Sequence, residues 1–424
     1  MLLRFEVSNH RSIMEPVELS MVAVDDDRPA ARSYERLNEK VLTVAGVYGP
    51  NASGKSNLLD AFAWISVAVR DSLRSWDRRI PRNAFKFAVG PETPSTFEVE
   101  MMVDGVRYEY RVELDDEGVV FEGLYSYPER RRRSLFERDG LEVTFRRGLG
   151  GLSGTRELLT PTTLALSAAM RLDIPEVEGF GRLLANVGIL GGQRHLGGRS
   201  WSPWEAMSST QRLFIDATRG EQLALFGESE SEQFGSKSAL ALLRLADLGI
   251  DDVKVVDDLA GSDGDVRPRL WFVHRAAGQE LLFDLGEESA GTRTWFGLIG
   301  PMLWALRNGQ VLLFDEIDAS LHPKLSARLL ELFQDPEANP YGAQLIFTTH
   351  DTSLLNHLNR DEVWLTEKNE RGATVLTALA EYGGDKVRRS LNLEKAYLQG
   401  RFGAVPQFDQ RLLRSVLGLA AGGD

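Results

Sequence analysis

The sequence predicts an α/β fold in which a parallel sheet carries helices on both faces. The apolar run 41–48 leads through a glycine-rich turn into a segment with helical spacing of apolar residues, from about 57 to 74. Uninterrupted apolar strands at 311–314 and 344–349 alternate with helical segments, which is typical of parallel strands buried on both faces. A run of short β-type segments at 97–147 adds an antiparallel meander.

The elements at the N-terminus are predicted to be strands. Residues 2–8 alternate between apolar and polar, and 17–24 is the expected hairpin partner. Within 97–147, DG and DDEG turns separate the strands of the meander. The basic run Arg130 to Arg133 lies between two of these strands. We interpret it as a solvated turn, with contact to nucleic acid or a partner as the alternative.

The middle of the chain, from about 154 to 248, has a helical pattern interrupted by GILGGQRHLGG and GESESEQ. No heptad pattern persists over three or four repeats, so a long coiled-coil arm is not expected. Two strands are predicted within 269–285 and another at 362–367. The DGD at 263–265 is expected to be a surface turn rather than a pair of metal-binding carboxylates.

Composition and charge exclude several classes of protein. The 424 residues include 43% hydrophobic and 26% charged residues, which is typical of a folded globular chain. There is no cysteine, which excludes disulfides, thiolate metal sites and a cysteine nucleophile. The net charge of −13 argues against general binding of nucleic acid. The longest uncharged stretch, 41–54, is too short to span a bilayer and no signal peptide is evident, so we expect a cytoplasmic protein.

The glycine-rich turn GPNASGKS at 49–56 matches the pattern G-x-x-x-x-G-K-[ST] for binding phosphates. Its glycines allow successive backbone N–H groups to point inward, and the following helix adds its positive end. Lys55 would supply a charge to the β- and γ-phosphates, and Ser56 a hydroxyl ligand to magnesium. The residues predicted to contact a nucleotide here are Asn51, Ala52, Ser53, Gly54, Lys55, Ser56 and Asn57.

A second candidate site follows the buried strand at 311–314, where Asp315 and Glu316 stand at its carboxyl end. Ligands of open α/β sheets bind at this edge. Asp315 is placed to hold magnesium directly or through water. Glu316 is predicted to polarise the water that attacks the γ-phosphate.

The strand at 344–349 ends in His350, which we predict lies near the phosphates, where its ring would sense the nucleotide state. The other five histidines (His10, His195, His274, His322 and His357) show no metal-ligand spacing and are expected to be structural.

Four segments in this order, VYGPNASGKSNLLDA, EESAGTR, LLFDEIDASLHPKL and FTTHD, resemble the ABC-type ATPase heads of SMC and DNA-repair proteins. The resemblance is greatest to stand-alone ATPases of bacterial anti-phage and abortive-infection systems (RloA-like, OLD-like). The opening MLLRFEVSNHRSI and the ending YLQGRFGAVPQFD are also similar to that group. This resemblance implies a P-loop NTPase fold of the ABC ATPase-head type. The expected domains are ATPase lobe I at 1–150, a helical insertion at 151–250 and ATPase lobe II at 251–424.

The resemblance also implies roles that spacing alone does not give. Ser289 to Thr292, with Ser289 and Gly291 as contacts, would be the signature motif that reaches the γ-phosphate held by a second subunit. Asp318 to Leu321 would be the loop at that dimer interface, and Arg11 would approach the nucleotide.

The expected function is therefore that of an ATPase that dimerises around ATP and Mg²⁺ and opens after hydrolysis, with catalysis by Glu316, Lys55 and His350. The first hypothesis for its role is anti-phage defence, in which the switch controls a separate effector, a nuclease. The alternative is an SMC-like ATPase that clamps DNA in repair or chromosome maintenance. The basic run at 130–133 favours that alternative, while the net charge and the absence of a coiled-coil pattern oppose it.

Overall fold

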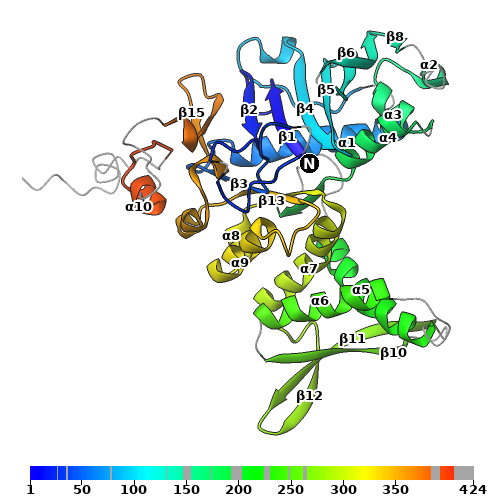
Figure 1. The fold of residues 1–424 in the computed structure, drawn as a ribbon, viewed down its shortest axis with the longest axis vertical. Helices are drawn as coiled ribbons and strands as arrows, with labels where there is room; N and C mark the ends of the chain where they lie inside the picture. Colours follow the sequence, from blue (N-terminus) through cyan, green and yellow to red (C-terminus); the bar gives the residue numbers. More distant parts are fainter. Residues whose placement is uncertain are drawn as a thin grey trace, which may run out of the picture.

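The structure is a computed structural model that describes residues 1–25, 27–34, 37–76, 79–129, 131–146, 154–172, 174–191, 203–223, 230–246, 249–260, 265–382 and 392–404. In Figure 1 a six-stranded sheet lies between an upper part, which holds the N-terminal strands, and a lower part, which holds a three-stranded sheet. Arg130, residues 263–264 of the DGD and residues 405–409 of the predicted tail lie outside the described residues.

The central sheet has six strands, in the order β16 (Thr374–Ala378), β15 (Val363–Lys368), β3 (Val44–Tyr48), β14 (Gln344–Thr348), β13 (Val311–Asp315) and β9 (Gly188–Gly191). All neighbours are parallel except β15 and β16. Alternate residues of β13 face two different cores, with Val311 and Leu313 in one and Leu312 and Phe314 in the other. The predicted parallel sheet, covered on both faces, is confirmed.

The upper part is a seven-stranded antiparallel sheet, in the order β2 (Val17–Ser20), β1 (Leu2–Ser8), β4 (Ser95–Val103), β5 (Val106–Leu114), β6 (Val119–Tyr127), β7 (Arg133–Asp139) and β8 (Glu142–Phe145). The predicted hairpin and meander are thus confirmed, and β1 pairs with β4 to make them one sheet.

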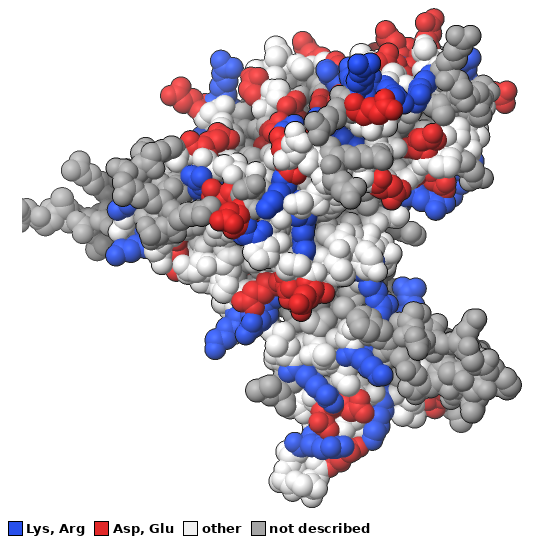
Figure 2. Space-filling view, viewed as in Figure 1, with Lys and Arg blue, Asp and Glu red and all other residues white. Residues whose placement is uncertain are grey.

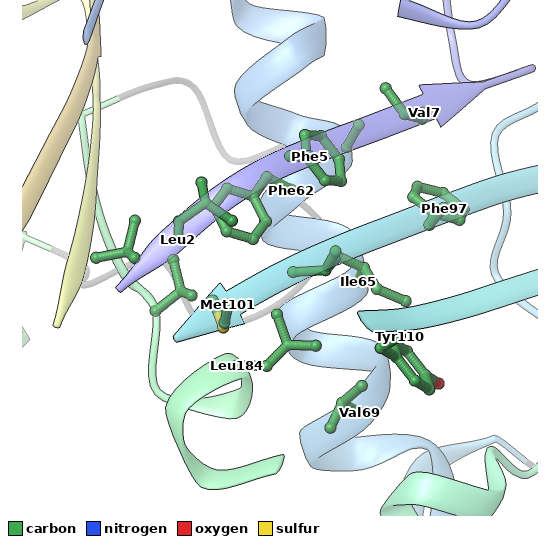
Figure 3. Packing of buried hydrophobic residues seen from close by; sticks show 14 of the residues in the cluster. Leu2, Phe5, Val7, Phe62, Ile65, Val69, Phe97, Met101, Tyr110 and Leu184 are labelled. Atoms are coloured by element: carbon green, nitrogen blue, oxygen red, sulfur yellow. The ribbon is translucent and has the colours of Figure 1, made fainter. Parts of the chain in front are cut away.

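Helix α1 (Lys55–Ser75) is held between the two sheets. Its residues Phe62, Ile65 and Val69 are buried in the same core as Phe5 of β1 and Val47 of β3. Figure 3 shows the side chains of α1 lying against those of β1 and β4, and the rings of Phe5 and Phe62 stack at 4.8 Å. Burial on both sides fits the nearly continuous apolar stretch in the middle of the helix, at 61–69, and it fixes the glycine-rich turn at its start.

Helices α2 (Thr155–Leu158), α3 (Ala165–Ala169) and α4 (Pro175–Ala185) follow the meander. The predicted glycine-rich interruption GILGGQRHLGG begins with residues 188–191, for which the sequence predicts no strand. These residues form β9, which pairs in parallel with β13 at the edge of the central sheet. A four-residue apolar run such as GILG does not distinguish a buried strand from part of a helix by periodicity. The division of the chain at 150 and 250 remains a prediction.

The lower part contains α5 (Pro203–Leu223), α6 (Glu230–Ala246) and an antiparallel sheet of β10 (Ile250–Ala260), β11 (Asp265–Ala276) and β12 (Gln279–Asp284). The two strands predicted within 269–285 are present as β11 and β12. The sequence does not predict strand β10, because the only structure that it indicates in this region is a surface turn at the DGD. Asp265, the last residue of the DGD, begins β11.

Helix α7 (Ala290–Asn308) joins the lower part to the central sheet and packs against α5 and α6. Pro301 interrupts its backbone hydrogen bonding from inside the helix. The buried hydroxyl of Thr210 on α5 accepts a bond from Gly300 N at 2.8 Å and donates to Phe296 O at 2.6 Å. The Thr210 hydroxyl thus bridges Gly300 N and Phe296 O in the turn before Pro301 and ties α7 to α5.

The C-terminal part holds α8 (Ile317–Ser320), α9 (Pro323–Gln334) and α10 (Leu393–Leu398). The tail folds back onto β15, since Ala404 N donates to the Glu367 carboxylate and Tyr397 Oη donates to Ala404 O at 2.6 Å. Among the described residues, none of the helices combines the length and apolar character needed to cross a bilayer.

Candidate active site

The phosphate loop joins the end of β3 to the start of α1. Gly54 has φ +111°, and a Cβ placed on it would lie 2.1 Å from Thr374 Oγ1. Gly49 has φ +152°, and its Cβ would lie 2.4 Å from Thr366 O. Only glycine fits these two positions, because both the backbone conformation and the close neighbours exclude a side chain. The glycine pattern found in the sequence therefore has a direct steric cause.

Lys55 is folded into this loop. Its side chain is 6% exposed, and its ammonium donates to Gly49 O at 2.9 Å and Pro50 O at 3.1 Å. Burial lowers the pKa of Lys55, while the nearby carboxylates Asp315 and Asp318 act in the opposite direction. The charge is thus held within the loop by weak carbonyl acceptors that a phosphate oxygen would outcompete.

Three hydroxyl and carboxyl groups meet beside the loop. Ser56 Oγ donates to Asp315 Oδ1 at 2.9 Å, and Thr348 Oγ1 donates to the same oxygen at 2.6 Å. The strand order β3–β14–β13 causes this meeting, because the three carboxyl ends lie at one edge of the sheet. The sequence predicts a role for Ser56 and Asp315 but not for Thr348. Thr348 is the last residue of an apolar strand, and its contact with Asp315 becomes evident only when the order of the strands is known.

Glu316 occupies a left-handed backbone conformation, with φ +54°, directly after β13. Its N–H donates to Thr348 Oγ1 at 2.8 Å, and the residue is exposed. A non-glycine residue in this conformation is uncommon and costs about 1–3 kcal/mol. The bond from Thr348 helps to keep Glu316 there, with its carboxylate outside the buried cluster.

Asp318 and His350 are brought together by the end of β14. Asp318 Oδ1 accepts from Thr349 Oγ1 at 2.7 Å and from His350 N at 3.1 Å. His350 is exposed next to the strand end that neighbours β3. The structure thus places both predicted residues at the same edge as the loop and Asp315.

Strands β15 and β16 support the loop from its other side. Ser53 Oγ bonds to Thr366 Oγ1 at 2.6 Å, and Thr374 Oγ1 donates to Ser53 O at 2.9 Å. Ser12 Oγ bonds to Thr374 Oγ1 at 2.8 Å and accepts from Asn57 Nδ2 at 2.6 Å. Sequence reasoning did not find Ser12, Thr366 or Thr374, because each is an ordinary strand or turn residue whose partner lies far along the chain.

Arg11, the residue before Ser12, also has a left-handed backbone conformation, with φ +51°. Its Nε pairs with the buried carboxylate of Asp60, one turn into α1 after Ser56. His10 is fully buried and its Nε2 lies 2.7 Å from the same oxygen. His10 therefore packs into the protein, while Arg11 remains beside the loop.

The predicted signature residues lie elsewhere. Ser289 caps α7, accepting from Thr292 N at 3.0 Å, and both Ser289 and Gly291 are exposed. The start of α7 is tied to the lower sheet, since Glu288 bonds to His274 of β11 at 2.7 Å. The hydrogen bonds described for the signature residues Ser289 and Gly291 lie within the start of α7 and do not reach the phosphate loop of the same chain.

Two arginines of the basic run pair with acidic residues. Arg132 pairs with Glu109 at 3.0 Å and stacks 3.6 Å from the ring centre of Tyr125, and Arg133 pairs with Glu129 at 2.8 Å. Figure 2 shows basic and acidic side chains interspersed over the upper part of the face in view. The charges of Arg132 and Arg133 are thus balanced by ion pairs.

Comparison with known proteins identifies the domain. The model of the family "AAA domain, putative AbiEii toxin, Type IV TA system" matches residues 44–151 and 217–356, which is more than half of the chain. These segments contain the phosphate loop, Asp315, Glu316 and His350. Together with the loop geometry, the match confirms the predicted P-loop NTPase fold. A search of curated proteins gave no match.

Solved structures give more distant similarities. An SMC head bound to the C-winged helix domain of ScpA is 14% identical with a TM-score of 0.46, over 90% of this chain and 99% of that one. The SMC head domain from Thermotoga maritima is 13% identical with a TM-score of 0.42, over 89% and 98%. An Smc head with an extended coiled coil bound to the C-terminal domain of ScpA, from Pyrococcus furiosus, is 15% identical with a TM-score of 0.42, over 90% and 97%. All three scores lie below 0.5, so function is inferred below from the family and from this chain's own residues.

Proposed function

Since the chain belongs to the family of AAA domains described as putative AbiEii toxins of Type IV toxin–antitoxin systems, we propose that it is an ATP-hydrolysing molecular switch. One observation carries this proposal. A buried lysine in a glycine-rich loop, the Ser56 hydroxyl and the carboxylates of Asp315 and Glu316 meet at one edge of a parallel sheet. These are the groups that phosphoryl transfer requires.

The donor set at Ser56 and Asp315 fits Mg²⁺. Magnesium prefers oxygen ligands and is usually held by one or two carboxylates together with substrate phosphates, rather than by a cage of protein groups. Bound there, the ion would neutralise charge on the transferring phosphoryl group.

The other residues of the site have separate roles in binding the phosphates and activating the water. Lys55 binds the β- and γ-phosphates, and the N–H groups of the loop from Asn51 onward surround them. Glu316 orients and deprotonates the attacking water, and the ring of His350 contacts the γ-phosphate. The left-handed backbone of Glu316 and the bond from its N–H to Thr348 support this role, because they fix the backbone of Glu316 next to Asp315.

A second copy of the chain completes the site. Ser289 and Gly291 stand at the exposed start of a 19-residue helix, and such a start favours negative charge. They would reach the γ-phosphate bound by the other subunit, with Asp318 at the same interface. Dimerisation around ATP then couples the state of the nucleotide to the shape of the assembly.

In the cell, we propose that this switch acts in anti-phage defence by controlling a separate effector, a nuclease. The description of its family, which refers to a toxin of a toxin–antitoxin system, supports this role. The pairing of Arg132 and Arg133 with glutamates supports control of a protein over direct clamping of DNA.

Nucleotide binding is tested first, by titrating ATP into the protein and its Lys55→Ala variant. Loss of the charge-assisted contacts is expected to weaken binding by about tenfold or more. Lys254→Ala, which removes a lysine from the lower sheet, is the control. Unchanged ATP affinity in Lys55→Ala would remove the phosphate-loop assignment.

The cellular role is tested by affinity purification of Glu316→Gln from its native cells with Mg²⁺ and ATP. A stoichiometric second protein with a nuclease or other toxic active site, identified by mass spectrometry, is the expected result. Recovery of nucleic acid without a protein partner would instead establish the SMC-like DNA ATPase. Lys55→Ala, treated in the same way, shows whether the association depends on bound nucleotide.

A further inference from the structure

One lysine close to the phosphate loop has no role in the chemistry described so far. Lys368 is the last residue of β15, on the opposite side of β3 from β14 and β13. The groups assigned to the γ-phosphate, Glu316 and His350, follow those two strands. Lys368 thus flanks the loop at the end away from the reacting phosphate.

A chain of hydrogen bonds connects Lys368 to the loop. Its ammonium donates to Thr374 Oγ1 at 3.0 Å, and that hydroxyl donates to Ser53 O at 2.9 Å. The same hydroxyl lies close to Gly54, since a Cβ placed on Gly54 would be 2.1 Å from Thr374 Oγ1. An ammonium has three donors and Thr374 accepts one, so Lys368 retains capacity to bind an anion at this place.

The neighbouring groups define which part of a nucleotide would lie here. Ser12, which contacts Thr374, accepts from Asn57, the residue after Ser56 in the first turn of α1. Phosphates held with their γ end beside Asp315 extend across the loop toward this turn. The α-phosphate and the nucleoside would therefore lie on the side of β15 and β16.

We propose that Lys368 is a second phosphate-binding lysine, whose ammonium contacts the α-phosphate of the bound nucleotide. This inference rests on the proposed ATP binding and extends it to a new residue. Thr374 acts as a positioning residue, because its hydroxyl holds both the ammonium and the loop. The site then has a lysine at each end of the phosphate chain, with Lys55 at the β- and γ-phosphates.

The electrostatics of Lys368 agree with this role. Lys368 is an exposed residue, and partial burial lowers the pKa of its ammonium. A phosphate nearby would favour the charged form again. Binding of the nucleotide should then raise the pKa of Lys368, whereas a lysine that only supports the fold would not respond.

The test compares the affinities of ADP and of a non-hydrolysable ATP analogue for the protein, Lys368→Met and Lys368→Arg by calorimetry. Methionine keeps the apolar stem and removes the charge. We expect Lys368→Met to weaken both nucleotides by the same factor, about tenfold. Lys368→Arg should recover most of the loss. An unchanged melting temperature of the ligand-free Lys368→Met protein shows that its fold is retained.

Two results would overturn the inference. If Lys368→Met weakened the ATP analogue but not ADP, the lysine would contact the γ-phosphate. If it bound both as the wild type does, while Lys55→Ala lost binding, Lys368 would have no part in the site and the proposed function would stand. Normal binding by Lys55→Ala would remove the proposed function itself. Lys254→Ala controls for the loss of one positive charge.

Discussion

The phosphate loop and the start of α7 are built in opposite ways. Around the loop, Lys55, Ser53 and Asp315 are nearly completely buried. Ser53 and Asp315 make hydrogen bonds to other strands, and Lys55 bonds to carbonyls of the loop itself. At the start of α7, Ser289 and Gly291 are exposed, and Ser289 bonds only to its own helix among the contacts described. The first region is complete within one chain. The second is exposed to solvent, which the proposed contact with a nucleotide held by another copy requires.

The largest expected effect is on the chemistry at the loop. Glu316→Gln removes the general base and keeps the size of the side chain, so turnover is expected to fall by about 10²–10⁴-fold. ATP affinity should remain, because Lys55 and the loop are unchanged. Steady-state release of phosphate and calorimetric titration measure the two quantities. Glu331→Gln, a partly exposed position on α9, is the matched control, and equal turnover in Glu316→Gln would remove its catalytic role.

The next effect separates the two regions. Gly291→Asp places a negative charge at the start of α7, where a Cβ meets no atom closer than 3.8 Å and where a carboxylate favours the helix. The monomer should therefore keep its melting temperature and its ATP affinity.

In the Glu316→Gln background, ATP-dependent dimers should form with Gly291→Ala but not with Gly291→Asp, because the new carboxylate would face the γ-phosphate. Light scattering after size exclusion measures this. Dimers of Gly291→Asp at wild-type affinity would show that α7 starts outside the interface.

A smaller effect is expected within the buried cluster. Thr348→Val removes the hydroxyl that joins Asp315 to Glu316 N, and it leaves two buried polar groups with fewer bonds. The free energy of unfolding should fall by about 1–3 kcal/mol. Denaturation in urea checks this value. Thr377→Val, on a half-buried position of β16, provides the comparison, and equal stability of the two variants would contradict the importance of the cluster.

The smallest effect is expected at the basic run, away from both regions. Arg133→Ala breaks an ion pair with the exposed Glu129, and such pairs contribute about 0–1 kcal/mol. Stability and basal turnover should be nearly unchanged. A marked decrease in ATP turnover measured with added DNA would instead indicate that this turn contacts nucleic acid.

The parts of the fold and of the candidate site that could be predicted from the sequence are those whose pattern lies within one short segment. The loop at 49–56 contains its own steric reason for glycine, and the acids after 311–314 follow a strand whose burial is evident from four apolar residues. The order of strands is not visible in this way. No local pattern indicates that β14 lies between β3 and β13, and this order is what brings Thr348 to Asp315.

The elements that were missed share a physical cause. β9 is four residues long, and its state is decided by pairing with β13, far along the chain. β16 and β10 contain charged or polar residues among the apolar ones, and each is fixed by a neighbouring strand. The same holds for Ser12, Thr366 and Thr374. Their importance depends on partners that only the folded structure brings near.

The bonds of Thr374 also bear on the order in which the protein can mature during synthesis. This hydroxyl bonds to Ser12 and to Ser53 in the loop, which precede Thr374 along the chain by 362 and 321 residues. A nascent chain therefore carries the complete phosphate-binding motif long before it carries the strand that supports it. Contacts of such range form slowly, because the intervening chain must first be ordered. ATP binding would consequently begin only when nearly all of the described chain has left the ribosome, which keeps unfinished copies from acting as switches.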